Sequence, residues 1–94
     1  MAATAGKVAL VSGTTALTGS GCPLSATVVD FLGYGTTANC SETAPIAVSG
    51  TNSNARSVIR IASCTDTNNN SVDFSNPVTA PVARNSTTTP TTCP

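Results

Sequence analysis

The sequence predicts an all-β fold, a sandwich or barrel built from short strands. Three observations support this prediction. β-Branched residues dominate the apolar positions, and Thr and Ser fill much of the rest, a composition that suits a pleated, half-buried surface. Short apolar runs alternate with clusters of Asn, Ser, Thr, Gly and Pro, as in sandwiches and barrels. No segment has the periodicity of a long amphipathic helix, and a chain of 94 residues allows one domain.

The first expected strand is the apolar run 8–11, which lies between Gly6 and Gly13. Residues 14–18 are its expected hairpin partner, with Ser12 and Gly13 at the turn between them. The N-terminal part of the sheet is therefore expected to pair segments that are neighbours in the sequence.

The run 28–32 fits one face of a helix as well as a strand, because its apolar residues recur at both spacings. Its short length, and the glycines Gly33 and Gly35 that follow it, favour a strand. Asp30 lies within this strand and needs a partner if it is buried. The expected faces are Val29 with Phe31 on one side, and Val28, Asp30, Leu32 and Tyr34 on the other.

Two further short strands are expected in the second half of the chain. The run 57–61 alternates cleanly, which is the period of a strand. The run 72–74 repeats the pattern, with Asp73 facing outward. In the first of these strands the expected faces are Ile59 with Ile61, and Val58 with Arg60.

Four cysteines permit three disulfide pairings, and the sequence alone does not choose between them. We favour Cys22–Cys40, because these residues bracket the central strand, and Cys64–Cys93, because this bridge would tie down the end of the chain. Each bridge would stabilise the fold by about 2–4 kcal/mol by restricting the unfolded chain. Zinc is disfavoured, because no two cysteines are close in sequence and the chain has no His.

The domain division follows from the same features. Residues 1–76 are expected to form the sandwich, and residues 77–94 an extended tail rich in Pro and Thr. With two Phe, one Tyr and no Trp, the core is poor in bulky side chains, so covalent constraint is expected to matter. Pairing of Cys93 would pin the tail.

Charge and composition argue against several function classes. The chain has no His, the commonest catalytic acid or base at neutral pH, so we expect it not to be an enzyme. The net charge is zero and no run of like charge exists, so nucleic acid and anionic lipid are not expected partners. No run approaches a membrane span of about 20 apolar residues.

The cysteines also predict a compartment. Disulfide-stabilised chains of this size are typical of oxidising environments, so we expect an extracellular or cell-surface location. Residues 1–7 lack the basic and apolar regions of a secretory signal. We therefore expect the chain to be a mature or truncated piece of a longer secreted protein.

One loop is a candidate calcium site, and no other cofactor is expected. Asp66, Asn68 and Asn70 alternate along the segment 66–73, as in calcium loops, and Asp73 closes it. The loop lacks the Gly of the sharp turn, and beyond Asp73 no acidic residue stands where a full calcium loop ends. With at most two carboxylates, its affinity for calcium would be weak. The alternative is a set of Asx turns that link two strands.

Five blocks of the chain, in order, resemble bacterial lamin-tail domains. The blocks are GKVALV at 6–11, VVDFLGYG at 28–35, NSNAR at 52–56, DTNNNSVDF at 66–74 and PVARNS at 81–86. The resemblance implies an immunoglobulin-like β-sandwich. The family's first strands, with an acidic-Leu-x-Asn block and a Trp, have no counterpart here. We therefore expect an incomplete sandwich in which Met1 is an internal Met of a longer domain.

The resemblance also implies a role. In bacteria such domains are typically appended to secreted nucleases, phosphatases and other exported or surface proteins. We expect a non-catalytic module that tethers or displays a neighbouring domain and contacts protein or surface polymer. The alternative is a structural subunit that assembles through exposed sheet edges into a filament or surface layer, because missing strands would leave edges open. Some self-association is expected in either case.

Overall fold

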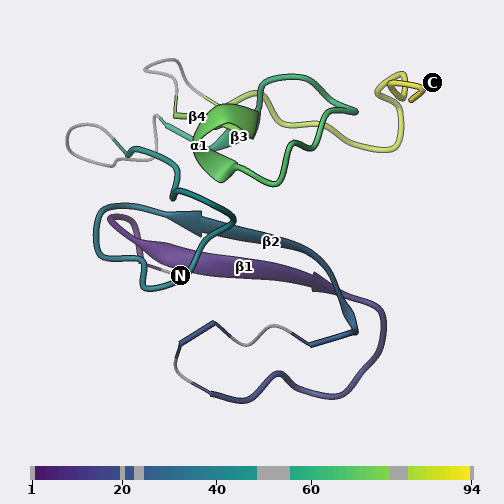
Figure 1. The fold of residues 1–94 in the computed structure, drawn as a ribbon. Coiled ribbons are helices and arrows are strands. Elements are labelled where there is room, and N and C mark those ends of the chain that lie inside the picture. The colour runs from purple at the N-terminus through teal and green to yellow at the C-terminus, as the bar shows by residue number, and fades with distance from the viewer. Residues whose placement is uncertain (1, 20, 23–24, 49–55, 77–80, 94) are drawn as a thin grey trace.

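The fold is described from a computed structural model, which covers residues 2–19, 21–22, 25–48, 56–76 and 81–93 (Figure 1). Residues 52–55 of the lamin-tail resemblance, and residues 77–80 and 94 of the expected tail, lie outside the described residues. The described strands form two small antiparallel sheets. The all-β prediction is confirmed at this level.

The first sheet pairs strand β1 (Gly6–Val11) with strand β2 (Val28–Tyr34). Val8 lies opposite Leu32, and the register shifts between Leu10 and Val11. The prediction that residues 14–18 pair with the first strand is wrong, because residues 28–34 take that place. Residues 14–18 contain one large apolar side chain, so pairing there would bury less apolar surface than pairing with β2.

The second sheet pairs strand β3 (Ile59–Arg60) with strand β4 (Phe74–Ser75). The strand expected over 57–61 is present in shortened form. The strand expected over 72–74 is largely wrong, because Val72 and Asp73 belong to the single helical turn α1 (Asn70–Asp73). Asn69 caps this turn: its backbone is extended and its side chain accepts a hydrogen bond from the Ser71 N–H.

Asp73 does not face outward as predicted. It is 4% exposed, because α1 turns it toward the loop that precedes the helix. Three alternating residues fit one turn of helix as well as a strand, and the cap at Asn69 decides in favour of the helix. The strand predicted over 72–74 is therefore largely wrong because three residues are too few to distinguish the period of a strand from that of a helix.

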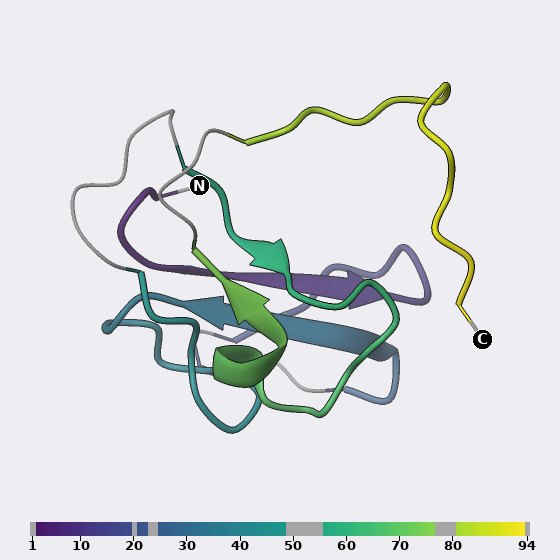
Figure 2. The same cartoon turned by 90° about the horizontal axis from the view of Figure 1, so that it is seen from above.

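The two sheets form two layers, with β3, β4 and α1 over one face of β1 and β2 (Figures 1 and 2). The alternation predicted for residues 57–61 is confirmed. Arg60 points toward β2, where it pairs with Asp30, whereas Ile59 and Ile61 are 46% and 63% exposed. The partner that Asp30 needs is therefore Arg60.

The buried core is small and sits around the C-terminal half of β2. Its apolar members are at most 7% exposed, and Ile46 joins Tyr34 through an isolated parallel bridge. Several large apolar side chains elsewhere are exposed to solvent, among them Val8 at 47% and Leu10 at 61%. The buried apolar residues are Phe31, Tyr34, Cys40 and Ile46.

Both predicted disulfides are confirmed. Cys22 and Cys40 are joined across 18 residues, with their Cα atoms 5.1 Å apart. Cys64 and Cys93 are joined across 29 residues, with their Cα atoms 5.3 Å apart. The first bridge fastens the loops beside β2, and the second fastens the tail 81–93 to the loop after β3.

Candidate functional site

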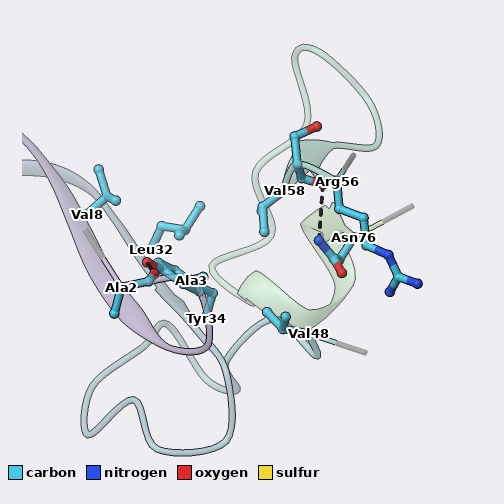
Figure 3. Close-up of a pocket in the computed structure, with 10 residues that line it drawn as sticks. Ala2, Ala3, Val8, Leu32, Tyr34, Val48, Arg56, Val58 and Asn76 are labelled. Carbon is cyan, nitrogen blue, oxygen red and sulfur yellow. Dashed lines mark hydrogen bonds between the residues drawn. The ribbon is translucent and has the colours of Figure 1, made fainter. Parts of the chain in front are cut away.

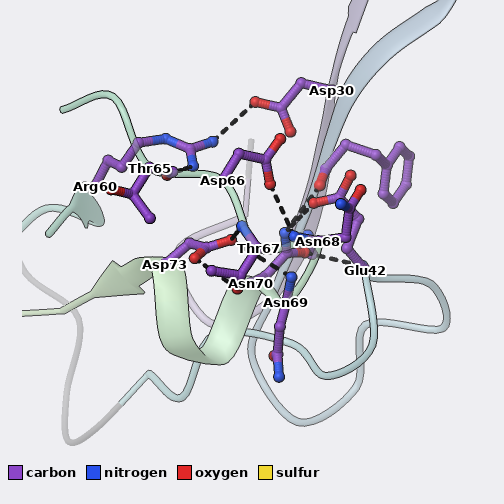
Figure 4. Close-up of polar contacts among 12 residues, drawn as sticks. Asp30, Glu42, Arg60, Thr65, Asp66, Thr67, Asn68, Asn69, Asn70 and Asp73 are labelled. Atoms are coloured by element: carbon purple, nitrogen blue, oxygen red, sulfur yellow. Dashed lines mark hydrogen bonds and ion pairs between the residues drawn. The ribbon is translucent and has the colours of Figure 1, made fainter. Parts of the chain in front are cut away.

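The most highly connected side chain described in the molecule is Asn70, which is fully buried. Its Oδ1 accepts hydrogen bonds from the Gly33 N–H (2.8 Å) and the Glu42 N–H (3.1 Å). Its Nδ2 donates to the Phe31 carbonyl (3.0 Å) and to Glu42 Oε2 (2.9 Å). All four hydrogen bonds that an amide side chain can make are therefore used (Figure 4).

This arrangement closes the edge of β2 that faces away from β1. The amide of Asn70 bonds the Phe31 carbonyl and the Gly33 N–H as a neighbouring strand would. Ile46 continues the edge, donating its N–H to the Gly33 carbonyl and accepting from the Gly35 N–H. A sheet of two strands thus gains a third partner made of one side chain and one residue of backbone.

Glycine at position 33 makes this close approach possible. A Cβ there would collide with the carbonyl oxygen of Cys40 and lie 2.8 Å from the Cβ of Ser41. At position 35 the backbone is left-handed, with φ of +81°, which also favours glycine. Gly33 therefore lets the segment that carries Cys40 and Glu42 lie directly against β2, whereas Gly35 makes room for the backbone of Thr4 and Ala5.

The environment of Glu42, next to Asn70 at the edge of β2, disfavours the ionised form of its carboxyl. Burial, followed by the negative charges of Asp30 and Asp66, raises the pKa of the Glu42 carboxyl above its ordinary value. The hydrogen bond from Asn70 acts in the opposite direction but does not outweigh these effects on the pKa. Ionised Glu42 is therefore less favourable in the folded chain than in the unfolded chain.

The pKa of the Asp73 carboxyl is shifted in the opposite direction to that of Glu42. Burial acts to raise the pKa of the Asp73 carboxyl, but hydrogen bonds and the positive charge of Arg60 outweigh burial and lower it below the ordinary value. Thr67 donates both its N–H (2.9 Å) and its hydroxyl (2.8 Å), and Asn69 donates its N–H. The carboxylate thus organises the loop that leads into α1.

The four residues of the candidate calcium site do not share one cavity. Asp66 Oδ1 accepts from the Asn68 N–H, which makes an Asx turn, while Asn70 points to β2 and Asp73 to Thr67. Asn68 has a φ of 55°, a conformation that Asn tolerates. Among the described residues, no three His, Cys, Asp or Glu side chains form a metal-binding group. Calcium binding stays a prediction.

A cationic clamp joins the two layers. The guanidinium of Arg60 lies 2.9 Å from Asp30 Oδ2, donates to the Thr65 carbonyl and sits 4.3 Å from the centre of the Phe74 ring. Asp30 Oδ1 is buried and has no hydrogen-bond partner among the described residues. The clamp therefore ties β3 and β4 to β2 through side chains rather than through a shared apolar core.

An apolar cleft of about 460 Å³ lies between the two layers. Val8, Leu32 and Tyr34 of the first sheet form one wall, and Val48 and Val58 face them across the gap (Figure 3). Arg56 and Asn76 lie at its margin, where the Asn76 amide donates to the Ser57 carbonyl. The cleft lies within the size range of ligand sites, about 300–1,000 Å³.

Sequence reasoning does not identify the two main features of this region. The asparagine run 68–70 fits turns or calcium ligands, and nothing in the run distinguishes the buried Asn70 from its exposed neighbour Asn68. The cleft is missed because its walls come from residues 2–3, 8, 32, 34, 48, 56–58 and 76, which only the fold brings together. The alternation at 57–61, which places Val58 inward, is the one usable signal.

Comparisons with protein-family models, with curated proteins and with solved structures gave no match. The likeness to lamin-tail domains stays a prediction. Within the described ranges, no helix is long and apolar enough to cross a membrane.

Proposed function

We propose that this chain is a non-catalytic interaction module of an exported protein, an incomplete immunoglobulin-like sandwich of the lamin-tail type. The observation that carries the proposal is the open apolar cleft between the two sheets. Its walls are aliphatic and aromatic, and the exposed Val8 and Leu10 extend the apolar surface along β1. Such a surface binds apolar side chains of a protein partner rather than performing acid–base chemistry.

The titratable groups support the same proposal. Glu42 and Asp73, the carboxyls with shifted pKa values, are held by hydrogen bonds to Asn70 and to Thr67 and Asn69. Neither is among the residues that line the cleft. Their environments serve the fold, and no pair of acid and base faces a shared cavity in the described part of the chain.

Export is supported by the two disulfides, which suggest an oxidising, extracellular environment. In such a protein the module would tether or display a neighbouring domain. A hydrolase domain in the same reading frame would support this role, and sequencing upstream of Met1 is the direct way to look for it.

The cleft is tested with 8-anilinonaphthalene-1-sulfonate, a fluorescent probe of apolar surface, added to the folded oxidised chain. Val58→Glu places a charge in the cleft wall, and we expect it to weaken probe binding by about tenfold. Ile59→Glu is the matched control, because Ile59 is adjacent in sequence but faces away from the cleft, and it should leave binding unchanged. Equal effects of the two variants would contradict the proposal.

A second function is favoured by the sheet edges. β1 has no strand on its outer side among the described residues, and Leu10 on it is 61% exposed. Edge strands of this kind pair with other chains, so a subunit that assembles into a filament or surface layer is the alternative role. Sedimentation at rising concentration tests it: association that Leu10→Lys abolishes supports assembly, and a monomer at all concentrations refutes it.

A further inference from the structure

The four basic residues of the chain occupy four different settings. Lys7 lies in β1 and its Nζ donates to the Gly21 carbonyl and to Asn39 Oδ1. Arg60 lies in β3 and pairs with Asp30, and Arg56 is half-buried at the margin of the cleft. Among the residues that the structure describes, Arg84 is the one basic residue that is itself exposed and lies in an exposed segment without helix or strand.

The tail around Arg84 is open to solvent. All residues 81–93 are exposed, and the hydrogen bonds found for them among the described residues stay within the tail. The one described attachment of the tail to the rest of the molecule is the bridge from Cys93 to Cys64. Figure 2 shows the tail running apart from the two sheets as a separate length of chain.

An endopeptidase needs several residues on both sides of the scissile bond in extended form, so cleavage of a folded protein concentrates where the backbone opens at little cost. Around Lys7 and Arg60 this opening would break the pairing of a sheet. Around Arg84 it breaks only a local turn, in which Asn85 Oδ1 accepts from the N–H and the hydroxyl of Thr87.

We propose that the Arg84–Asn85 peptide bond is a processing site for an arginine-specific endopeptidase that acts on the folded chain. Water adds to the carbonyl carbon of Arg84 and the bond to the nitrogen of Asn85 breaks, which leaves a carboxylate on Arg84 and an amine on Asn85. Because Cys93 remains joined to Cys64, residues 85–94 stay attached after the cut. The product is a two-chain molecule with a new N-terminus at Asn85.

The test is limited digestion of the folded, oxidised chain with trypsin, followed by mass spectrometry with and without reduction. The first product should be one species heavier by one water, which separates into two fragments at Arg84 after reduction. We expect cleavage at Arg84 to be at least about tenfold faster than at Lys7 or Arg60, which lie in paired strands. Cleavage at either of these two at an equal or greater rate would overturn the proposal.

Three variants sharpen this test. Arg84→Gln should abolish the early cut, and Arg84→Lys should keep it for trypsin but lose it for an arginine-specific enzyme. Asn85→Ala removes the acceptor of the local turn and should speed the cut about threefold. An early cut that persists in Arg84→Gln, or one that Asn85→Ala slows, counts against the site.

Discussion

The edge of β2 that faces away from β1 and the tail 81–93 satisfy their backbone hydrogen bonds by different means. Backbone N–H and C=O groups need hydrogen-bond partners in both regions. At β2 the partners are Asn70 and Ile46, both at most 1% exposed. The tail is exposed throughout, so water is the partner of its backbone groups, and one disulfide joins it to the rest of the molecule. A chain poor in bulky side chains thus secures one region with buried polar contacts and the other with a covalent bond.

The largest expected effect comes from Asn70→Ala. The substitution leaves the buried Gly33 N–H, Glu42 N–H and Phe31 carbonyl without partners, and we expect a loss on the order of 4 kcal/mol in the free energy of unfolding. Asn85→Ala in the tail is the matched control and should cost less than about 0.5 kcal/mol, because its hydrogen bonds are local and exposed. Urea unfolding measures both.

If Asn70→Ala does not fold, Asn70→Asp keeps the acceptor at Oδ1 and loses only the donor. It should then be destabilised relative to the native chain but remain folded at low pH, where the introduced carboxyl and that of Glu42 are both protonated. Equal stabilities for the Asn70 and Asn85 variants would show that the edge of β2 is not closed as described.

The second-largest effect is expected from the two disulfides, which should contribute unequally to the free energy of unfolding. Chain entropy alone gives about 3 kcal/mol for the 18-residue loop and slightly more for the 29-residue loop. The structure predicts the reverse order. Cys40 is buried beside β2, whereas the tail gains freedom in the folded state too when its bridge is removed.

We therefore expect the double variant Cys22→Ala and Cys40→Ala to cost about 3 kcal/mol, and Cys64→Ala with Cys93→Ala to cost about 1 kcal/mol or less. Thermal unfolding of both double variants checks this order. A larger loss from the second pair would mean that the tail packs against the sheets.

How far the sequence predicts this architecture depends on the region. The strands at 8–11 and 28–32 and the facing of Arg60 were predictable, because apolar runs and alternation are local signals. The favoured disulfide pairing is confirmed, although the sequence alone left three pairings open. The partner of the first strand was not predictable. Residues 14–18 and 28–34 are both candidates, and only the amount of apolar surface that each would bury distinguishes them. Asn70 was not predictable either, because an Asn that closes a sheet edge looks like an Asn in a turn.

The two perturbed carboxyls should give stability opposite dependences on pH. Glu42 has a folded-state pKa above its ordinary value of 4.5, so its ionisation reduces stability as pH rises from that value through the folded-state pKa. Asp73 has a folded-state pKa below its ordinary value of 3.8, so it adds stability above that value, which is lost as pH falls through the folded-state pKa.

Glu42→Gln should therefore raise the melting temperature at neutral pH, and Asp73→Asn should lower it. Melting curves recorded from about pH 2 to about pH 7 test both signs. Each variant should also remove its own part of the pH dependence. Destabilisation by Glu42→Gln at neutral pH would show that the hydrogen bond from Asn70 outweighs the cost of the charge.

The smallest expected effect is that of calcium. Extracellular calcium modules bind at about 0.1–1 mM, and binding at Asp66, Asn68, Asn70 and Asp73 would raise the melting temperature at such concentrations. Because Asn70 and Asp73 already use their oxygens in hydrogen bonds within the fold, we expect a rise of less than about 1 °C. A larger rise, lost in Asp66→Asn, would establish a functional site.

The most direct measurement of the contrast between the two regions is native-state hydrogen exchange on the oxidised chain. We expect the amides of Gly33 and Ile46 to exchange at least about 100-fold more slowly than those of residues 82–89. Reduction of Cys64–Cys93 should leave exchange of the tail amides unchanged, because water is already their partner. Protected tail amides, or a Gly33 amide that exchanges as fast as the tail, would contradict this expectation.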